Sequence, residues 1–484
     1  MGMGRRGNAG DDGGLHVAMF PFLAFGHIAP FVQLSKKLVA HGARVSFLSA
    51  PANITRVASL LSPSPVDLIP LELPHVDGLP PEVQSTADAT PAMAELLIKA
   101  VDLTRPQVQS LLEELRPQAI FHDFAQPWLP SVAHPLGVKT VFFSVFAAVS
   151  SAFLTIPARR SLPGAFPSVE DLRLPPPGFP SPPLSCIDAV PLYQSADFSY
   201  IFKSFDGRPC VFDRVVSCMS VSSAIAIKTC REMEGPYVDY VEAQYDKPVL
   251  LAGPVVPEPL EGELEPRWAK WLDGFPAGSV IFCSFGSETV LTEEGIRELA
   301  LGLELTGLPF FLVLNFPKGG DDSADAMQTL RKKLPEGFEE RVKGTGVVHS
   351  GWVQQRHIMT HPAVGCFLSH AGMSSVVEGL IGGCQLVMLP QRGDQFLNAR
   401  LFAGDLGVGV EVRRREKDGG FEREDVRMAV KTVMVGAEEG EEPGIRSTVR
   451  KNSQRWREFL LDQEAHTRFT AQFVDKLKEM ALSR

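Results

Sequence analysis

Residues 367–383 read FLSHAGMSSVVEGLIGG, an apolar run followed by a short turn and a helical pattern. The pattern predicts a strand that ends at about Ser369 and a helix that begins near Ser374 or Ser375. In parallel sheets, ligands bind at the carboxyl ends of the strands, and free N–H groups at a helix start attract phosphate. Ser375 and Glu378 also have the spacing of a capping box, which would give them a structural role only. The segment therefore predicts either an anion site or a helix cap.

The same order of strand and helix recurs along the whole chain. Apolar runs without polar alternation, separated by helical patterns, are typical of a parallel sheet covered on both faces. A chain of 484 residues is also long for a single core. The sequence therefore predicts two Rossmann-like α/β domains that face a cleft. The runs are HVAMFPF from 16, RVSFLSA from 44, QAIFHDF from 118 and TVFFSVF from 140 in the first half, and SVIFCSFGS from 279, PFFLVLN from 309, GVVHSGWV from 346 and QLVMLP from 385 in the second.

Changes in composition divide the chain. Residues 252–266, AGPVVPEPLEGELEP, are rich in Pro and Glu and predict a linker. Residues 161–186 are so dense in proline that we expect a long surface loop, and such loops often shape a ligand site. We therefore expect an N-terminal domain over 1–251, a C-terminal domain over 267–455, and a helical tail over 456–484 that packs back towards the N-terminal domain.

Composition argues against several classes of partner. The net charge is −10 and no dense basic run occurs, so we expect no nucleic-acid partner. The seven cysteines are scattered and never form a C-x-x-C pair, which indicates free thiols in a reducing compartment and argues against a zinc site. The stretch TVFFSVFAAVSSAFLTIPA from 140 is better explained by a strand and a helix than by a membrane span. We expect a cytoplasmic monomer without a membrane span.

Side chains that suit a nucleotide sugar follow three of the predicted strands. Trp352 and Gln355 come after the strand from 346, and Asp394 and Gln395 come after the strand from 385. The turn and helix start quoted above lie between them. An aromatic face, a helix start, a carboxylate and an Asp-Gln pair suit a base, a diphosphate, a ribose and a sugar respectively. The constellation predicts a nucleotide-sugar site.

The run from Trp352 to Gln395 resembles the signature box of plant family 1 UDP-glycosyltransferases. The usual pattern of that box is W-x-P-Q, then H-C-G-W-N-S, E, P and D-Q, and this chain has WVQQ, HAGMSS, Glu378, Pro390 and DQ in register. The runs FGHIAP from 25 and CSFGS from 283 extend the resemblance to the rest of the chain. The resemblance implies a GT-B fold and an inverting transferase that moves a sugar from UDP to a small-molecule hydroxyl, with no metal and no other cofactor.

The resemblance also implies a donor-side role for each matching residue. Met373 and Ser374 stand where the family usually has Trp and Asn, so one sugar contact and one phosphate contact differ. A Gln at position 395 commonly accompanies UDP-glucose in the family, so glucose is the expected sugar. By resemblance, uracil contacts Trp352 and the backbone near Val353, and the ribose contacts Gln355 and Glu378. The diphosphate contacts His370, Ser287 and Ser375, and Ser374 lies beside them. The transferred sugar contacts Asp394 and Gln395.

A histidine and an aspartate in the first half are the candidate catalytic pair. His27 follows the first predicted strand, and Pro30 is suited to the first turn of the next helix. The resemblance implies that His27 is the general base. Asp123, at the end of the strand from 118, would orient its imidazole and stabilise the imidazolium. His122 competes for this role, but neighbouring residues on a strand point to opposite faces, so only one of the two can face His27.

The first half would also line the acceptor site. The segments FPFLAF, FAQPW and SVFAAVSSAF are apolar or aromatic and suit a flat plant metabolite such as a flavonoid or a terpenoid. The details WVQQ, GCQLV and RGDQFLNARL resemble the branch of the family that extends the sugar of a flavonoid glycoside. The alternative acceptors are aglycones alone. The candidate acceptor residues are Phe22, Phe25, Phe124, Trp128 and Phe146.

Two other classes of protein are alternatives to a transferase. A dinucleotide-dependent oxidoreductase should carry G-x-G-x-x-G after the first strand, where this chain has AFGHIAP. A nucleotide-sugar-binding protein without turnover would need only the donor box. The presence of both His27 and Asp123 favours an enzyme.

Overall fold

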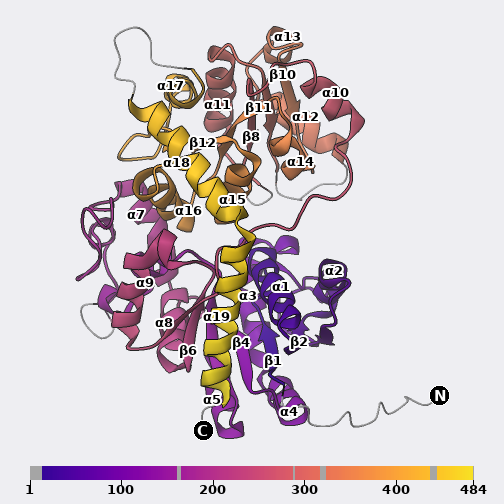
Figure 1. Ribbon diagram of the computed structural model, residues 1–484, viewed down its shortest axis with the longest axis vertical. Helices are drawn as coiled ribbons and strands as arrows, with labels where there is room; N and C mark the ends of the chain where they lie inside the picture. Colours follow the sequence, from indigo (N-terminus) through magenta and orange to yellow (C-terminus); the bar gives the residue numbers. More distant parts are fainter. Residues whose placement is uncertain (1–13, 161–164, 287–288, 317–322, 436–443, 483–484) are drawn as a thin grey trace, which may run out of the picture.

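The computed structural model describes residues 14–160, 165–286, 289–316, 323–435 and 444–482. The chain forms two α/β halves, and the C-terminal helix runs from the second half down the side of the first (Figure 1). Each half has its own parallel sheet with helices on both faces. This architecture is the one predicted from the apolar runs.

The N-terminal half is built on a seven-stranded parallel sheet. Its strands are short apolar runs, and every residue of β1 and β4 is buried. A strand buried on both faces must be apolar throughout, which explains why polar alternation is missing. In sheet order the strands are β3 (Asp67–Pro70), β2 (Arg44–Ser49), β1 (His16–Phe20), β4 (Ala119–His122), β5 (Lys139–Ser144), β6 (Ala224–Ile227) and β7 (Val249–Leu251).

Helices connect these strands and cover both faces of the sheet. The longest of them, α1, packs on β2 and carries the FGHIAP segment in its first two turns. The helices of this half are α1 (Phe25–Ala40), α2 (Pro51–Leu61), α3 (Pro91–Leu103), α4 (Arg105–Leu115), α5 (Leu129–Ala133), α6 (Ala148–Leu154), α7 (Leu192–Phe198), α8 (Val211–Val221) and α9 (Arg231–Tyr245), with short 3-10 turns at Thr86–Asp88, His134–Leu136, Pro157–Arg159, Asp171–Arg173 and Ser199–Phe202.

The C-terminal half repeats the arrangement with a six-stranded parallel sheet. Its strands in sheet order are β10 (Gly346–His349), β9 (Phe310–Val313), β8 (Val280–Ser284), β11 (Val364–Ser369), β12 (Gln385–Met388) and β13 (Gly409–Glu411). Its helices are α10 (Pro266–Leu272), α11 (Glu293–Leu305), α12 (Ser323–Lys333), α13 (Phe338–Arg341), α14 (Gln355–Thr360), α15 (Met373–Gly382), α16 (Asp394–Ala399), which continues into a π-helical turn η6 (Arg400–Asp405), α17 (Arg423–Met434), α18 (Gly444–Leu461) and α19 (Gln463–Leu482).

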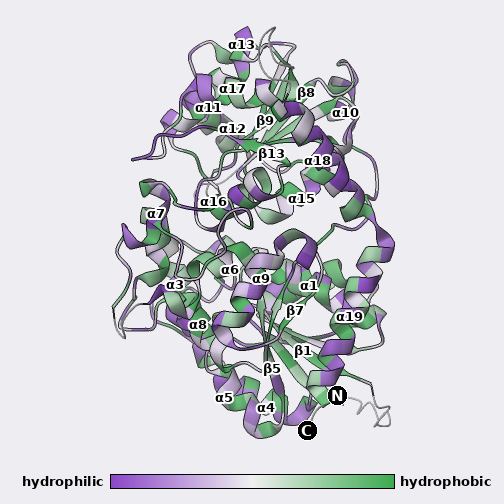
Figure 2. Cartoon of the chain, turned by 60° about the vertical axis from the view of Figure 1, so that its left-hand side comes forward, coloured by the Kyte–Doolittle hydropathy of each residue, from purple (hydrophilic) through white to green (hydrophobic). Residues whose placement is uncertain are grey.

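Hydropathy follows this layering. The strands are hydrophobic, and the polar residues gather on the outer surfaces of the helices (Figure 2). None of the helices in the described ranges is both long enough and apolar enough to cross a membrane. The apolar stretch from 140 is the strand β5 followed by α6, as the sequence predicts. All seven cysteines are free thiols.

The chain passes between the halves twice. Residues 252–265, all described, form neither helix nor strand and connect β7 to α10. At the other end α19 returns and packs on β7 and α1 of the first half. Phe473 of α19 lies 6.1 Å from Phe121 of β4, measured between ring centroids, and both belong to one apolar cluster.

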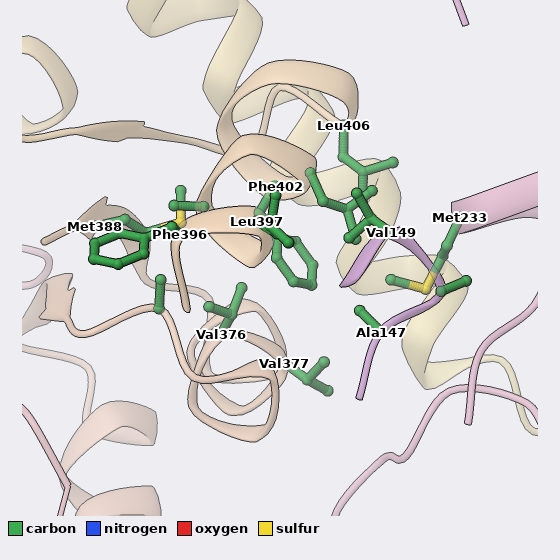
Figure 3. Packing of buried hydrophobic residues seen from close by; sticks show 14 of the residues in the cluster. Ala147, Val149, Met233, Val376, Val377, Met388, Phe396, Leu397, Phe402 and Leu406 are labelled. Carbon is green, nitrogen blue, oxygen red and sulfur yellow. The ribbon is translucent and has the colours of Figure 1, made fainter. Parts of the chain in front are cut away.

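A contact of buried apolar residues also joins the two halves. Val149 of α6 and Met233 of α9 face Phe396 and Leu397 of α16 (Figure 3). Polar bonds flank this contact, because Asp405 at the end of η6 accepts hydrogen bonds from the Tyr237 hydroxyl at 2.5 Å and from the Cys186 N–H at 2.7 Å. The proline-dense segment thus ends in a contact with the second half.

Candidate functional site

In each sheet the strand order reverses once, next to the first strand of that half. In the first sheet the order reverses between β1 and β4, and in the second between β8 and β11. Ligands of such sheets bind beyond the carboxyl ends of the strands at this reversal point. His27 and Asp123 follow β1 and β4, whereas Gly286 and His370 follow β8 and β11. The topology therefore brings the candidate residues of each half to one edge.

His27 and Asp123 form a hydrogen-bonded pair. The distance from His27 Nδ1 to Asp123 Oδ2 is 2.6 Å. The helix α1 begins at Phe25, so His27 lies in its first turn and Pro30 lies inside the helix, slightly deeper than the sequence predicted. The pair leaves the other imidazole nitrogen, Nε2, as the atom that can accept a proton.

The Asp123 carboxylate is held by the backbone around it. Its Oδ1 accepts from the Phe124 N–H at 2.7 Å, and its Oδ2 also accepts from the Phe22 N–H at 3.3 Å. His122 points away, and its Nε2 lies 2.8 Å from Ser222 Oγ in the interior. Burial lowers the pKa of His122 to about 4, so this imidazole is neutral at pH 7. The competition between His122 and Asp123 for His27 is thereby decided in favour of Asp123.

Aromatic rings surround the His27 imidazole. The ring centroids of Phe22, Phe124 and Phe146 lie 5.6, 5.6 and 5.5 Å from that of His27. Phe25 and Phe146 are 37% and 40% exposed, so an apolar surface is available beside the imidazole. Trp128 packs against Phe20, with centroids 6.4 Å apart, and belongs to the same apolar cluster as Phe22 and Phe124.

The turn after β11 differs from the predicted one at the helix start. Helix α15 begins at Met373, and Gly372 is its N-cap without a side-chain hydrogen bond. Ser375 is therefore already inside the helix, and the capping-box interpretation of Ser375 and Glu378 is wrong. The first N–H groups of α15 keep the positive potential that attracts an anion. Ser374 and Ser375 lie in this first turn.

The His370 imidazole is clamped between two glycines. A Cβ on Gly372 would lie 2.6 Å from His370 Nε2, and a Cβ on Gly286 would lie 3.3 Å from its Cε1. Ala371 is held at φ +61°, a left-handed conformation that is unfavourable for alanine. Such strain is concentrated at functional sites, where the surrounding structure maintains it.

His370 has an unsatisfied buried nitrogen. Its Nδ1 is buried and has no hydrogen-bond partner among the described residues. Burial, with a smaller effect of Arg392, lowers the pKa of His370 to about 4, so it is a neutral hydrogen-bonding group at pH 7. Ser287, another candidate for contact with the diphosphate, lies outside the described residues.

Trp352 presents an open ring at the end of β10. Its side chain is 77% exposed, which is unusual for the largest apolar residue, while Val353 beside it is buried. Nearby, Gln355 Nε2 donates to Glu378 Oε2 at 2.9 Å. Burial raises the pKa of Glu378, and the bond from Gln355 opposes that shift. The glutamate thus faces α14 and the Trp352 loop rather than capping its own helix.

The Asp394–Gln395 pair begins α16. Asn398 Nδ2 donates to Asp394 Oδ2 at 3.0 Å, and burial raises the Asp394 pKa. Gln395 Oε1 accepts from the Gln391 N–H at 3.0 Å, so its carbonyl oxygen already holds its own loop. The loop is fixed from the other half, because Asp197 Oδ2 accepts from the Gly393 N–H at 2.6 Å.

One charged residue of this region was missed by the sequence analysis. Lys228 follows β6 and is 7% exposed. The carboxylates of Asp394 and Glu234 are its electrostatic neighbours, and Asp394 also interacts with His27. A single lysine after the run AIAI belongs to no motif, so nothing in the sequence identified it.

The sequence profile of the UDP-glucoronosyl and UDP-glucosyl transferase family matches residues 274–444. The chain is 53% identical over 468 residues to an anthocyanidin-3-O-glucoside rhamnosyltransferase of Petunia hybrida, covering 96% of this chain and 97% of that protein. This chain belongs to the UDP-glycosyltransferase family. An anthocyanidin 3-O-glucoside 2''-O-glucosyltransferase of Ipomoea nil is 38% identical over 467 residues, covering 96% and 98%.

Solved glycosyltransferases share the fold of this UDP-glycosyltransferase. A UDP-glucosyltransferase from Polygonum tinctorium, solved with 3,4-dichloroaniline, superposes with a TM-score of 0.73 at 22% identity, covering 97% of this chain and 99% of that one. The fold is therefore GT-B, as predicted. The UDP-glycosyltransferase is an enzyme that uses a UDP-sugar donor. The described residues contain no group of three or more His, Cys, Asp or Glu side chains that could hold a metal ion.

Proposed function

We propose that this UDP-glycosyltransferase adds a sugar to the sugar of a flavonoid 3-O-glycoside. The observation that carries the proposal is the His27–Asp123 pair, which lies beside an apolar wall. The names of the Petunia and Ipomoea relatives support the acceptor class, because both describe transfer to an anthocyanidin 3-O-glucoside.

His27 acts as the general base in this proposal. Its Nε2 takes the proton of the acceptor hydroxyl, the oxygen attacks the anomeric carbon, and the bond from that carbon to the UDP oxygen breaks. Asp123 stabilises the imidazolium through the 2.6 Å hydrogen bond. One displacement inverts the anomeric centre. The Phe22, Phe25, Phe124 and Phe146 rings hold the flat part of the acceptor.

The second half binds the donor. Trp352 stacks on uracil beside the Val353 backbone, and Gln355 and Glu378 hold the ribose. The start of α15 and the neutral His370 receive the diphosphate and stabilise the charge that develops on UDP, so no metal is needed. Met373 and Ser374 alter this end of the site. Asp394 and Gln395 bind hydroxyls of the transferred sugar.

Trp352→Ala is expected to weaken UDP and UDP-sugar binding about five- to a hundredfold, since stacking of a base on an aromatic ring is worth about 1–3 kcal/mol. Because the ring is 77% exposed, its loss should leave the thermal unfolding temperature unchanged. Calorimetric titration with UDP measures the effect. Glu378→Ala should lower the affinity for UDP in the same way. Unchanged UDP affinity in both variants would contradict the nucleoside site.

Two donor sugars compete. Gln395 favours glucose by resemblance, but its carbonyl oxygen is engaged by its own loop, which leaves the amide NH₂ to contact a sugar. The Petunia relative, at 53% identity, is named for rhamnose transfer. Met373 also replaces an indole by a thioether, which offers no hydrogen-bond donor and suits a 6-deoxy sugar. Glucose remains the donor predicted from the sequence, and rhamnose is the second candidate.

Initial rates with UDP-glucose, UDP-rhamnose, UDP-xylose and UDP-galactose on one flavonol 3-O-glucoside and its aglycone test both parts of the proposal. We expect turnover of the glucoside with glucose or rhamnose as the best donor, and a disfavoured donor should be about ten- to a hundredfold slower because it leaves a buried polar group unpaired. Turnover of the aglycone alone would contradict the acceptor class. Binding of donor without any turnover would indicate a nucleotide-sugar-binding protein.

We further propose that the enzyme works in the cytoplasm as a monomer. The seven free thiols, six of them buried, support a reducing compartment. Sedimentation of the purified protein tests the oligomeric state.

A further inference from the structure

We propose that Lys228 is a specificity-determining residue that donates hydrogen bonds to the sugar already present on the acceptor. The inference rests on the proposed function, in which that acceptor is a glycoside. It concerns a residue outside the aromatic wall and outside the donor site, at the carboxyl edge of the first sheet.

Strand geometry directs Lys228 towards the catalytic pair. Phe121 of β4 and Ala226 of β6 lie in the same apolar cluster as Ile28 of α1. Side chains alternate along a strand, so Asp123 and Lys228, each two residues further on, leave the sheet on the face that α1 covers. His27 lies on that helix. The ammonium group therefore extends on the same side of the sheet as the catalytic pair.

The spacing suits a sugar ring. Strand β5 separates β4 from β6, and strands lie about 4.8 Å apart, so Lys228 stands roughly 10 Å along the sheet edge from Asp123. When one hydroxyl of a pyranose is hydrogen-bonded to His27, the neighbouring hydroxyls of that ring lie in the space between Asp123 and Lys228. Asp394 of the other half is an electrostatic neighbour of both His27 and Lys228.

The Lys228 ammonium has the carboxylates of Asp394 and Glu234 as electrostatic neighbours, but it forms a hydrogen bond with neither. No hydrogen bond or ion pair joins it to any residue that the structure describes, although the residue is only 7% exposed. Glu234, the other charged neighbour, instead accepts from the Val149 N–H at 2.8 Å and holds the start of α6. The lysine is largely buried, and its ammonium is free to donate hydrogen bonds to a ligand that accepts them.

The chemistry of the group points to the acceptor rather than the donor. An ammonium has three N–H donors and no acceptor, and sugar hydroxyl oxygens accept such bonds. The flat flavonoid part needs apolar surface, which Phe22, Phe124 and Phe146 supply. The donor sugar already faces Asp394 and Gln395 on the other half. A cation on the acceptor half is therefore suited to a glycoside and adds nothing for an aglycone.

The test compares Lys228→Met, which keeps the length and removes the charge, with Lys228→Arg, which keeps the charge. Calorimetry on UDP-saturated enzyme measures the affinity for a flavonol 3-O-glucoside and for its aglycone. We expect Lys228→Met to lower the affinity for the glucoside about ten- to a hundredfold, because a charge-assisted hydrogen bond is lost. The affinities for the aglycone and for UDP should not change. Lys228→Arg should recover part of the loss.

Lys247→Met is the matched control, because Lys247 precedes β7 and so lies at the opposite, amino edge of the same sheet. It should change none of the three affinities. Equal weakening of glucoside and aglycone, or unchanged glucoside affinity, would overturn the inference alone. If Lys228→Met instead lowers the affinity for the donor and leaves the affinity for the glucoside unchanged, Lys228 acts with Asp394 in the donor site. That result would also overturn the inference. A wild-type enzyme that neither binds nor glycosylates the glucoside would overturn the proposed function together with the inference.

Discussion

His27→Ala is expected to lower kcat by about 10²–10⁴-fold, the range that general-base catalysis contributes. The acceptor hydroxyl would have to lose its proton to water in a site walled by Phe22, Phe124 and Phe146. UDP affinity should stay at the wild-type value, since His27 belongs to the first half and the donor residues belong to the second. Steady-state rates and a UDP titration on the same preparation measure the two quantities.

His41→Ala is the matched control for this variant. His41 lies at the C-terminal end of the same helix, where its Nδ1 bonds to the Lys37 carbonyl oxygen at 2.9 Å. Its loss removes an imidazole from α1 without touching the candidate site, so kcat should not change. Near-normal turnover in His27→Ala would contradict the assignment of the base.

Asp123→Asn is expected to lower kcat by about 10²-fold or more and to leave UDP affinity unchanged. The carboxylate accepts three N–H groups, from His27, Phe22 and Phe124. A carboxamide has only one oxygen, so its NH₂ must face at least one of these donors. If it faces His27, the imidazole must carry its proton on Nε2, and that nitrogen can no longer accept the proton of the substrate.

Thermal unfolding separates this effect from a loss of stability, because the substitution also disturbs the turn after β4. Asp67→Asn, which removes a surface carboxylate paired with Arg44 at 3.0 Å, is the control and should behave as wild type in both measurements. If the Asp123→Asn enzyme keeps the full kcat, the role of Asp123 is limited to binding the backbone N–H groups of Phe22 and Phe124.

The fold could be predicted because its strands are buried on both faces. Runs such as AIFH of β4 and VIFCS of β8 carry no polar alternation, and this leaves a parallel sheet as the simplest explanation. The start of α15 was less predictable. Ser374 and Ser375 are good caps by composition, but the helix begins earlier, at Met373, and its N-cap Gly372 has no side chain to mark the boundary.

The site could be predicted only as far as sequence motifs reach. The resemblance predicts roles for Trp352, His370 and Glu378 within one box, and for His27 and Asp123 after two strands. Contacts between the halves carry no such signal. The approach of Lys228 to Asp394 depends on how α16 packs against α6 and α9, which no local pattern specifies. Trp128 packs against Phe20, and its place in the acceptor site stays a prediction.

The return of α19 to the first half has a consequence for building hybrid enzymes. Exchanging acceptor specificity between two relatives by joining their chains at 252–265 would pair a foreign first half with the resident α19. Phe473, Val474 and Leu477 of that helix contribute to the core beneath Phe121. A hybrid cut only at the connecting segment would therefore mismatch its own interior, whereas one that also exchanges Gln463–Leu482 would transplant the recognition half as a complete folding unit.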